Sequence, residues 1–486
     1  MPQHSINHAW ILVIDQGGHA SRAQVIGQDG KVHGHGESPI SATLSSDGHI
    51  EYTPEKMLKS LQDAIQQATR NINSSHIQTA AMATQRSNII CWDKITGEAL
   101  SPIISWQDCR AHQWLATKKD HAHTIHQQTG LFLSAHYGAS KLHWCLHNID
   151  AVDKANQQHR LAWGPMASWL TTQLCLEHPF ICDAVNASRT LLWSLQKCDW
   201  SEELLQLFEL PVTGLPPSSA NHFNFGTITI NKHNIPLQIV TGDQAAALYA
   251  FGTPQTDTAY ITAGTGAFIL NPCGAQAPDN SPLLSSIVLL NQTGPYYVHE
   301  GTVNGAGSAL DHYATQLSLP DYITKLPEWL ARSENPPLFL NGFSGLGTPF
   351  MQAEFSSRFI GDGDAINHLV AVIESILFLL QLNLDHMKVL NPSLKRIIIG
   401  GGLARFNGFC QRLADLAGLV VIRPEQIETT CQGLAFLAFQ GLGLTQDKQN
   451  MTSLTDSAPF SPTDNPKIQR RYQQWLKAME QQIQHD

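Results

Sequence analysis

Residues 257 to 270, Asp257-Thr-Ala-Tyr-Ile-Thr-Ala-Gly-Thr-Gly-Ala-Phe-Ile-Leu270, have the pattern of a strand, a glycine turn and a returning strand. The chain opens in a similar way, because Trp10-Ile-Leu-Val-Ile14 runs into Asp15-Gln-Gly-Gly18 and residues 22 to 26 return as a second strand. The two halves therefore each begin with the same glycine-bearing hairpin, as an internal repeat would. Two such hairpins that face each other would hold a phosphate chain from both sides.

A carboxylate stands at the end of another apolar strand. Asp243-Gln-Ala-Ala-Ala247 follows Ile235-Pro-Leu-Gln-Ile-Val-Thr-Gly242, about twenty residues before the glycine turn at 264 to 266. A carboxylate beside backbone N–H groups that face phosphate oxygens is what phosphoryl transfer to an alcohol needs. The alternative is that Asp243 only caps a helix, since Asp before Gln-Ala-Ala-Ala is a good N-cap.

The length and composition indicate a globular protein of two domains. At 486 residues the chain exceeds the size of a single hydrophobic core, so two domains of about 200 to 250 residues with a cleft between them are expected. With 42% hydrophobic and 14% charged residues, it has the composition of a folded protein.

Charge and cysteine usage narrow the class of partner. A net charge of -10 argues against nucleic acid, which needs clustered Lys and Arg, and favours a small-molecule substrate. No segment approaches 18 consecutive apolar residues and the start has no signal-peptide pattern, so no membrane association is expected. The nine cysteines are odd in number and never spaced as C-x-x-C, which predicts a reducing cytoplasm.

The C-terminal half alternates helices and strands. The helical spacing of apolar residues over 364 to 387 predicts a largely buried helix, and residues 396 to 402 read as a buried strand that ends in a glycine turn, with a helix over 409 to 417. Residues 445 to 466 are rich in turn formers, and a last helix over 467 to 483 is expected to dock through Tyr472, Trp475 and Met479. The order of elements predicts an α/β chain.

Ten short motifs in order resemble the FGGY family of carbohydrate kinases, and its glycerol kinases more than its sugar kinases. They are Asp15-Gln-Gly-Gly-His-Ala-Ser-Arg22, Gln85-Arg86 with Trp92-Asp-Lys-Ile-Thr-Gly97, Trp106-Gln-Asp-Cys-Arg110, Lys141-Leu-His-Trp144, Asn186-Ala-Ser-Arg-Thr190, Gly242-Asp-Gln244, Gly264-Thr-Gly266, Phe343-Ser-Gly-Leu-Gly-Thr-Pro-Phe350, Gly401-Gly402 and Glu428-Thr-Thr430. The matches cover almost the whole chain.

The resemblance implies two actin-like ATPase domains of the ribonuclease H-like type, with ATP and substrate in the cleft between them. The expected division is a substrate-binding domain over 1–250, a nucleotide-binding domain over 251–445, and an extended segment with a C-terminal helix over 446–486. It further implies ATP and Mg²⁺ as cofactors, and a homodimer or homotetramer as the assembly.

The resemblance also assigns roles on the nucleotide side. Asp243 is expected to accept the proton of the substrate hydroxyl and, with Asp15, to hold Mg²⁺, while Arg22 offsets charge on the moving phosphoryl group. Residues expected to approach phosphates or nucleotide are Gly17, Gly18, Gly264, Thr265, Gly266, Gly307, Gly401 and Gly402. At Gly307, Gly401 and Gly402 a side chain would collide with ribose or adenine.

On the substrate side, the resemblance points to Arg86 as a donor to hydroxyl groups and to two aromatic rings, Trp106 and Phe268, as contacts for the carbon chain, with Gln244 beside them. Two positions depart from the glycerol kinases. Ser87 stands where these have a glutamate, and His136 where an aromatic residue is expected. The shorter Ser87 removes an acceptor and leaves space, which puts glycerol itself in doubt. Gly18 also replaces a usual threonine.

The prediction is an ATP- and Mg²⁺-dependent kinase for a terminal hydroxyl of a small polyol or sugar. One alternative is a ketopentose kinase that acts on a xylulose- or ribulose-like sugar, which Ser87 and His136 leave open. Another is a sugar-responsive ATPase on the same scaffold with weakened transfer, since a fold alone does not guarantee an activity.

Overall fold

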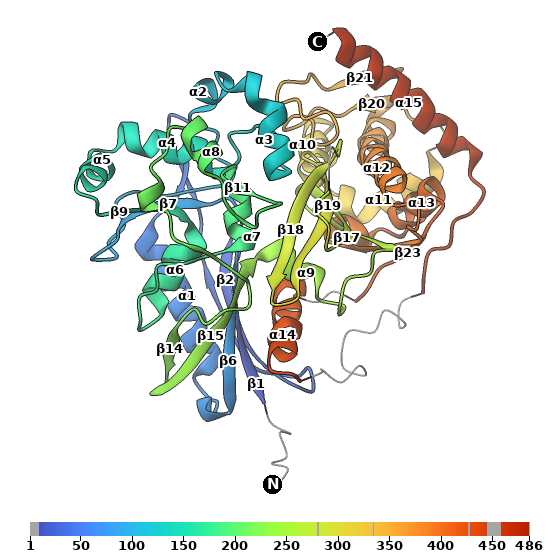
Figure 1. Cartoon of the computed structure of the whole chain (residues 1–486). Coiled ribbons are helices and arrows are strands. Elements are labelled where there is room, and N and C mark those ends of the chain that lie inside the picture. The colour runs from blue at the N-terminus through green and yellow to red at the C-terminus, as the bar shows by residue number, and fades with distance from the viewer. Residues whose placement is uncertain (1–8, 279–280, 334, 426–427, 445–457, 486) are drawn as a thin grey trace.

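The computed structural model describes residues 9–278, 281–333, 335–425, 428–444 and 458–485. Figure 1 shows two halves side by side, the N-terminal one coloured blue to green and the C-terminal one mostly yellow to red. Each half is built around a six-stranded mixed sheet with helices packed on it. The predicted α/β class is therefore confirmed.

The N-terminal sheet has the strand order β14-β15-β6-β1-β2-β3. β1 pairs antiparallel with β2, as the predicted hairpin requires, whereas β1, β6 and β15 run parallel. The strands are β1 (Trp10–Gln16), β2 (Ala20–Gly27), β3 (Val32–Pro39), β6 (Ile77–Thr84), β14 (Thr227–Ile230) and β15 (His233–Gly242).

The C-terminal sheet has the order β18-β19-β17-β16-β22-β23, and its five strands from β19 to β23 repeat the arrangement of β3-β2-β1-β6-β15. β16 pairs antiparallel with β17 in the second predicted hairpin, and β16, β22 and β23 run parallel. Strand β16 thus takes the place of β1. The strands are β16 (Thr258–Ala263), β17 (Ala267–Gly274), β18 (Leu284–Asn291), β19 (Gly294–Val303), β22 (Arg396–Gly400) and β23 (Val420–Ile422).

A second sheet and several short helices enlarge the N-terminal half. The five-stranded sheet, in the order β4-β5-β8-β7-β9, contains β4 (Thr43–Leu44), β5 (Ile50–Tyr52), β7 (Ile89–Asp93), β8 (Ile103–Ile104) and β9 (Leu161–Pro165). Helix α1 (Pro54–Thr69) covers β2 and β3. The others are α2 (His112–Ala116), α3 (Ala122–Thr129), α4 (Gly138–Asn148), α5 (Asp150–Gln157), α6 (Met166–Leu174), α7 (Ala184–Ala187), α8 (Glu202–Leu207) and α9 (Asp243–Leu248).

Helix α12 (Ala365–Leu390) is the core helix of the C-terminal half, as its apolar pattern predicts. It is long and apolar enough to cross a membrane, but 78% of its most apolar window is buried inside the protein. The neighbouring helices are α10 (Gly307–Gln316), α11 (Tyr322–Arg332) and α13 (Asn407–Ala417), beside the strand pair β20 (Leu338–Leu340) and β21 (Arg358–Ile360).

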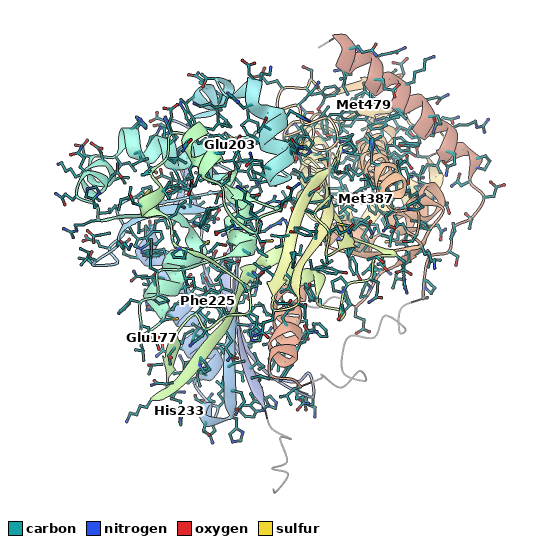
Figure 2. All side chains as sticks on the ribbon, viewed as in Figure 1. Glu177, Glu203, Phe225, His233, Met387 and Met479 are labelled. Carbon is teal, nitrogen blue, oxygen red and sulfur yellow. The ribbon has the colours of Figure 1, made fainter. Side chains whose placement is uncertain are left out.

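The last helix, α15 (Pro466–His485), lies along the outer edge of the C-terminal half (Figure 1). Tyr472, Trp475 and Met479 are buried, so the predicted docking face is confirmed. Figure 2 labels Met479 on α15 and Met387 on α12, both of them fully buried. Of the predicted extended segment, residues 445–457 lie outside the described residues, and 458–465 contain no helix.

Helix α14 (Thr429–Gly441) joins the two halves. It packs on α9, β1 and β6 of the N-terminal half, although it belongs to the C-terminal end of the chain (Figure 1). The absence of a side chain at Gly433 permits this, because a Cβ there would lie 1.8 Å from the carbonyl oxygen of Ala246. One buried apolar cluster therefore spans both halves, from Ile11 and Val13 to Leu434.

Candidate active site

The carboxyl ends of β1, β6 and β15 meet at one edge of the N-terminal sheet. Thr84 lies opposite Gln16 on one side and Gly242 on the other, so the three parallel strands end at the same level. Residues at the ends of parallel strands share an edge, where α/β proteins place their ligands. The functional side chains brought to this edge are those of Asp15, Arg86 and Asp243.

The C-terminal sheet has the corresponding edge. Thr262 near the end of β16 lies opposite Gly400 at the end of β22. The two turns that follow these strands, 264–266 and 401–402, therefore lie beside each other. Gly401 has a φ of +93°, and a Cβ there would lie 2.5 Å from the carbonyl oxygen of Ala263.

A cleft of about 1000 Å³ lies between the two edges. Residues of both halves line it, among them Asp243, Gln244, Phe268, Gly401, Gly402 and Glu428. Arg86 lies behind this lining, because its guanidinium donates to the side-chain oxygen of Gln244. Asp243 therefore lines a cavity between the two halves, as the acceptor of a kinase cleft would.

Asp15 and Asp243 are close enough to affect each other's ionisation. Burial, reinforced by the negative charge of Asp243, raises the pKa of Asp15 to about 7, although Arg22 acts in the opposite direction. Burial also raises the pKa of Asp243, against the pull of Arg86. Two mutually repelling carboxylates in a cleft fit a divalent cation, which would offset their charge.

Among the described residues, no cluster of three His, Cys, Asp or Glu side chains could enclose a metal ion. A cation at Asp15 and Asp243 would therefore complete its shell with water and phosphate oxygens. Mg²⁺ is the ion that binds in this way, through one or two carboxylates.

Asp243 is not the N-cap of its helix. The N-cap of α9 is Gly242, whose extended backbone leads from β15 into the helix, and Asp243 is the first helical residue. Its carboxylate accepts the N–H of Gln244 at 2.7 Å and remains partly exposed to the cleft. Asp243 is therefore the first residue of the helix rather than its N-cap, although its carboxylate does bond an N–H of the first turn.

Arg86 belongs to a buried ionic cluster that joins the two halves. Its guanidinium lies 3.3 Å from Glu300 on β19, and Arg189 contacts the same carboxylate at 3.1 Å. Ser286 donates to it at 2.8 Å. Burial acts to raise the pKa of Glu300, but the two arginines lower it to about 2. Sequence reasoning missed Glu300, which no motif marks, and quoted Arg189 without a role.

Ser87 and His136 have polar atoms without protein partners. The Ser87 residue has a φ of +64°, and its buried hydroxyl makes no hydrogen bond within the part of the chain described. The ring of His136 lies 5.2 Å from that of Trp106. Burial, and then the cations Lys141, Arg189 and Arg86, lower the pKa of His136, so the imidazole is neutral.

The glycine turns use some of their own donors. The N–H of Gly17 donates to Ala20 at 3.0 Å, and that of Gly264 donates to Gly266 at 2.9 Å. The N–H groups of Gly18, Thr265 and Gly266 form no such bonds in these turns. The backbone N–H groups that these turns leave available to a ligand are therefore those of Gly18, Thr265 and Gly266.

Two of the predicted nucleotide-side glycines are also required by the protein's own backbone. A Cβ at Gly307 would lie 2.6 Å from the carbonyl oxygen of Gly264, and one at Gly401 would lie 2.5 Å from that of Ala263. Gly402 lines the cleft and has open space around it, with Arg405 3.8 Å away.

Arg22 faces three carboxylates. It lies 3.9 Å from Asp15, 3.4 Å from Glu37 and 4.0 Å from Glu428, which comes from the other side of the cleft. Its side chain is 27% exposed. Arg22 therefore lies where the two halves approach each other, close to the aspartate edge.

Two ribonuclease H-like halves that face each other across a glycine-lined cleft with carboxylates on one wall define an actin-like ATP-dependent phosphotransferase. The N-terminal domain of the FGGY family of carbohydrate kinases matches residues 10–250, and its C-terminal domain matches residues 259–442. The chain belongs to the FGGY family of carbohydrate kinases, as its motifs predict.

Relatives and solved structures agree with this assignment. A glycerol kinase of Koribacter versatilis is 30% identical over 97% of both chains, and one of Dechloromonas aromatica is 32% identical over 92% of this chain and 91% of the other. The fold matches that of Plasmodium falciparum glycerol kinase with ADP (TM-score 0.88, 23% identity, 98% of both chains). It also matches a ligand-bound xylulose kinase from Lactobacillus acidophilus (TM-score 0.82, 20% identity, 97% of both chains). The protein is an ATP-dependent kinase of sugars or polyols.

Proposed function

We propose that this kinase phosphorylates a terminal hydroxyl of a polyol or sugar longer than glycerol, with Asp243 as the general base. The observation that carries the proposal is the convergence of Asp15, Arg86 and Asp243 at one sheet edge, opposite a glycine-lined edge. This arrangement supports a proton acceptor and a cation site on the wall opposite the glycine turns.

Asp243 is the proposed catalytic residue. An alcohol is a poor nucleophile at neutral pH, so a carboxylate must accept its proton as the bond to phosphorus forms. Asp243 is partly exposed to the cleft, and burial raises its pKa, which makes it a stronger proton acceptor. Gln244, next to it, would bind the substrate and orient it toward this carboxylate.

Asp15 and Asp243 are the proposed holders of Mg²⁺. The ion, when bound with ATP, supplies positive charge that offsets the phosphate oxygens. The contribution of the chain is to keep two carboxylates at the ends of β1 and β15, and Arg22 adds a third charge at the same place. Gly18, Thr265 and Gly266 would donate backbone N–H groups to phosphate, and Gly17 and Gly264 would shape the turns.

The substrate site is assigned to Arg86, Ser87, Trp106, His136 and Phe268 around Asp243. The unpartnered hydroxyl of Ser87 and the neutral imidazole of His136 are groups that bind hydroxyls or a carbonyl. Glycerol kinases of this family have a longer acidic side chain at the position of Ser87. The shorter residue leaves space for an additional carbon and its oxygen.

The division of the chain remains a proposal as well: substrate binding by 1–250, nucleotide binding by 251–445, and a docking segment over 446–486. Gly307, Gly401 and Gly402 would shape the nucleotide side. We place the protein in the cytoplasm, because all nine cysteines are free thiols, and expect a homodimer or homotetramer.

A substrate panel tests the proposed function. Release of ADP is measured with glycerol, erythritol, xylulose and ribulose, and phosphorylated products are identified by mass spectrometry. We expect the highest kcat/KM with a tetritol or a ketopentose, and a Ser87→Glu variant should shift preference toward glycerol. A wild-type enzyme that prefers glycerol contradicts the proposed substrate class, and ADP release without any phosphorylated product supports the weakened-ATPase alternative.

A further inference from the structure

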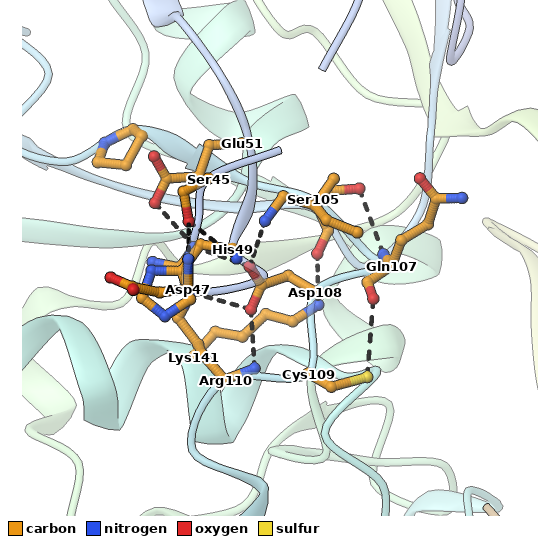
Figure 3. Close-up of polar contacts among 12 residues, drawn as sticks. Ser45, Asp47, His49, Glu51, Ser105, Gln107, Asp108, Cys109, Arg110 and Lys141 are labelled. Carbon is orange, nitrogen blue, oxygen red and sulfur yellow. Dashed lines mark hydrogen bonds and ion pairs between the residues drawn. The ribbon is translucent and has the colours of Figure 1, made fainter. Parts of the chain in front are cut away.

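Lys141 is a fully buried cation at the start of α4. Its side chain has no exposed surface, and it forms no ion pair with any carboxylate among the described residues. The ammonium instead donates to two backbone carbonyl oxygens, that of Ser105 at 2.7 Å and that of His136 at 2.8 Å. Figure 3 shows its long side chain extending toward Ser105. Burying a charged ammonium without a carboxylate partner costs free energy, so the position of Lys141 between two backbone carbonyls points to a specific role.

The two carbonyl groups belong to separate loops. Ser105 directly precedes Trp106, and the second carbonyl is that of His136 itself. The Trp106 and His136 rings meet edge to face, with their centroids 5.2 Å apart and an interplanar angle of 61°. One ammonium therefore fixes the backbone of both residues whose rings are assigned to the sugar.

Other contacts fasten the far side of the Trp106 loop. Asp108 accepts the N–H of Ile50 at 2.7 Å, and Arg110 pairs with Glu51 at 2.7 Å (Figure 3). The side chain of Asn88 accepts the N–H of Trp106 at 2.7 Å. The loop is thus held to β5 and to the segment after β6, while Lys141 ties it to the His136 loop.

We infer that Lys141 is a positioning residue for the sugar site, which sets the distance between the Trp106 loop and the His136 loop by bonding to both. The inference rests on the proposed function for the assignment of these two rings to the substrate. It predicts an effect on the affinity for sugar rather than on the affinity for ATP, because neither loop lies beside the glycine turn Gly400–Gly402 that lines the other wall of the cleft.

The charge of the Lys141 ammonium changes with pH near neutrality. Burial lowers the pKa of Lys141 to about 7, with Arg110 acting in the same direction and Asp108 and Cys109 against it. Above that pH the amine keeps N–H donors but loses charge-assisted hydrogen bonds, which are about twice as strong as neutral ones. The KM for the sugar should therefore rise as the pH increases through about 7.

Steady-state kinetics of Lys141→Met and Lys141→Arg test the inference. We expect Lys141→Met to raise the KM for the sugar by about tenfold or more, with kcat and the KM for ATP within about threefold. The sugar KM of Lys141→Met should no longer rise above neutral pH. Lys141→Arg keeps the N–H donors and the charge, so it should recover part of the affinity for the sugar. Equal changes in both KM values, or an unchanged sugar KM, would overturn the inference.

Lys118→Met is the matched control. Lys118 pairs with Glu209 at 2.7 Å, its side chain is only 15% exposed, and it lies in the same half of the protein. Loss of this lysine should leave both KM values unchanged.

Hydrogen exchange provides a test that does not depend on turnover. In Lys141→Met, residues 103–111 and 132–138 should lose protection together, while residues 45–52 keep it through Asp108 and Arg110. If Lys141→Met does not fold, Lys141→Arg is measured in the same way. Unchanged exchange in both loops overturns the inference even in an active kinase, whereas a wild-type enzyme that phosphorylates no sugar contradicts only the proposed function.

Discussion

The two halves of the protein share one sheet topology but place different residues at the ends of their strands. In the N-terminal half, β1 and β15 lead to Asp15 and Asp243, while in the C-terminal half β16 and β22 lead to the turns at 264–266 and 401–402. Carboxylates accept protons and bind cations, whereas glycine turns admit close backbone approach and offer N–H groups. Under the proposed function, the same scaffold would support chemistry on one wall of the cleft and nucleotide binding on the other.

The two walls of the cleft also differ in the electrostatic cost of burying their residues. Burial, reinforced by the negative charge of Asp243, raises the pKa of Asp15 to about 7. The glycine wall depends instead on backbone geometry that glycine adopts without strain, as at the positive φ of Gly401. Substitutions of the carboxylates should therefore act through charge, whereas substitutions of the glycines should act through backbone conformation.

The largest expected effect is on the carboxylate wall. Asp243→Asn keeps the shape of the side chain but removes the proton acceptor, so kcat should fall by about 10³-fold or more. Binding of ATP, measured by calorimetry, should change by less than about threefold. The control is Asp257→Asn, directly before β16, where the carboxylate pairs with Arg396 at 3.1 Å at the opposite end of the strands from the glycine turns. An Asp243→Asn enzyme with substantial turnover would remove this residue from the mechanism.

The second effect concerns the ionic cluster between the halves. Glu300→Gln leaves Arg86 and Arg189 without their buried anion, so the free energy of unfolding should fall by about 3 kcal/mol, and the sugar KM should rise. Glu374→Gln is a matched control, because Glu374 is also buried between two arginines, Arg412 at 2.7 Å and Arg471 at 2.6 Å, but inside the C-terminal half. Denaturant unfolding should give similar losses for both variants, with a change in sugar KM for Glu300→Gln alone.

The third effect depends on pH. The pKa of Asp15 is raised from 3.8 to about 7, so between these values the folded state binds more protons than the unfolded state and stability falls as the pH rises. Without ATP and Mg²⁺, Asp15→Asn should therefore be more stable than the wild type at pH 8, by about 2 kcal/mol. This difference should shrink toward pH 4, and thermal unfolding across this range measures it. A difference that does not vary with pH would contradict the raised pKa.

The smallest effect is on the glycine wall. Gly401→Ala forces a Cβ against the backbone of Ala263 at a positive φ, so the free energy of unfolding should fall by about 2 kcal/mol. The neighbouring Gly402→Ala has open space and should change stability by no more than about 0.5 kcal/mol. Chemical denaturation of both variants separates backbone strain from contact with a nucleotide. Equal losses in the two would mean that strain at Gly401 is not the cause.

Much of the secondary structure could be predicted because its signals are local. The hairpins at β1–β2 and β16–β17 follow from apolar runs that flank glycine turns, and α12 and α15 follow from helical spacing. Asp243 could be predicted for the same reason, because it directly follows the apolar run of a strand. Glu300 could not be recognised in this way, because a lone Glu in a strand carries no local signal. Lys141 lies in one of the ten motifs, but the motif assigns it no role.

The sequence by itself determined the two α/β repeats, the family, and the residue types available for phosphoryl transfer, because periodicity and turn chemistry act over a few neighbouring residues. Only the tertiary structure decided which of these residues meet. The parallel registry of β1, β6 and β15 brings together residues more than 200 positions apart, and the buried bonds of Lys141 and Glu300 connect loops and halves that no local pattern relates. Such contacts form because buried charges must find partners wherever the fold places them.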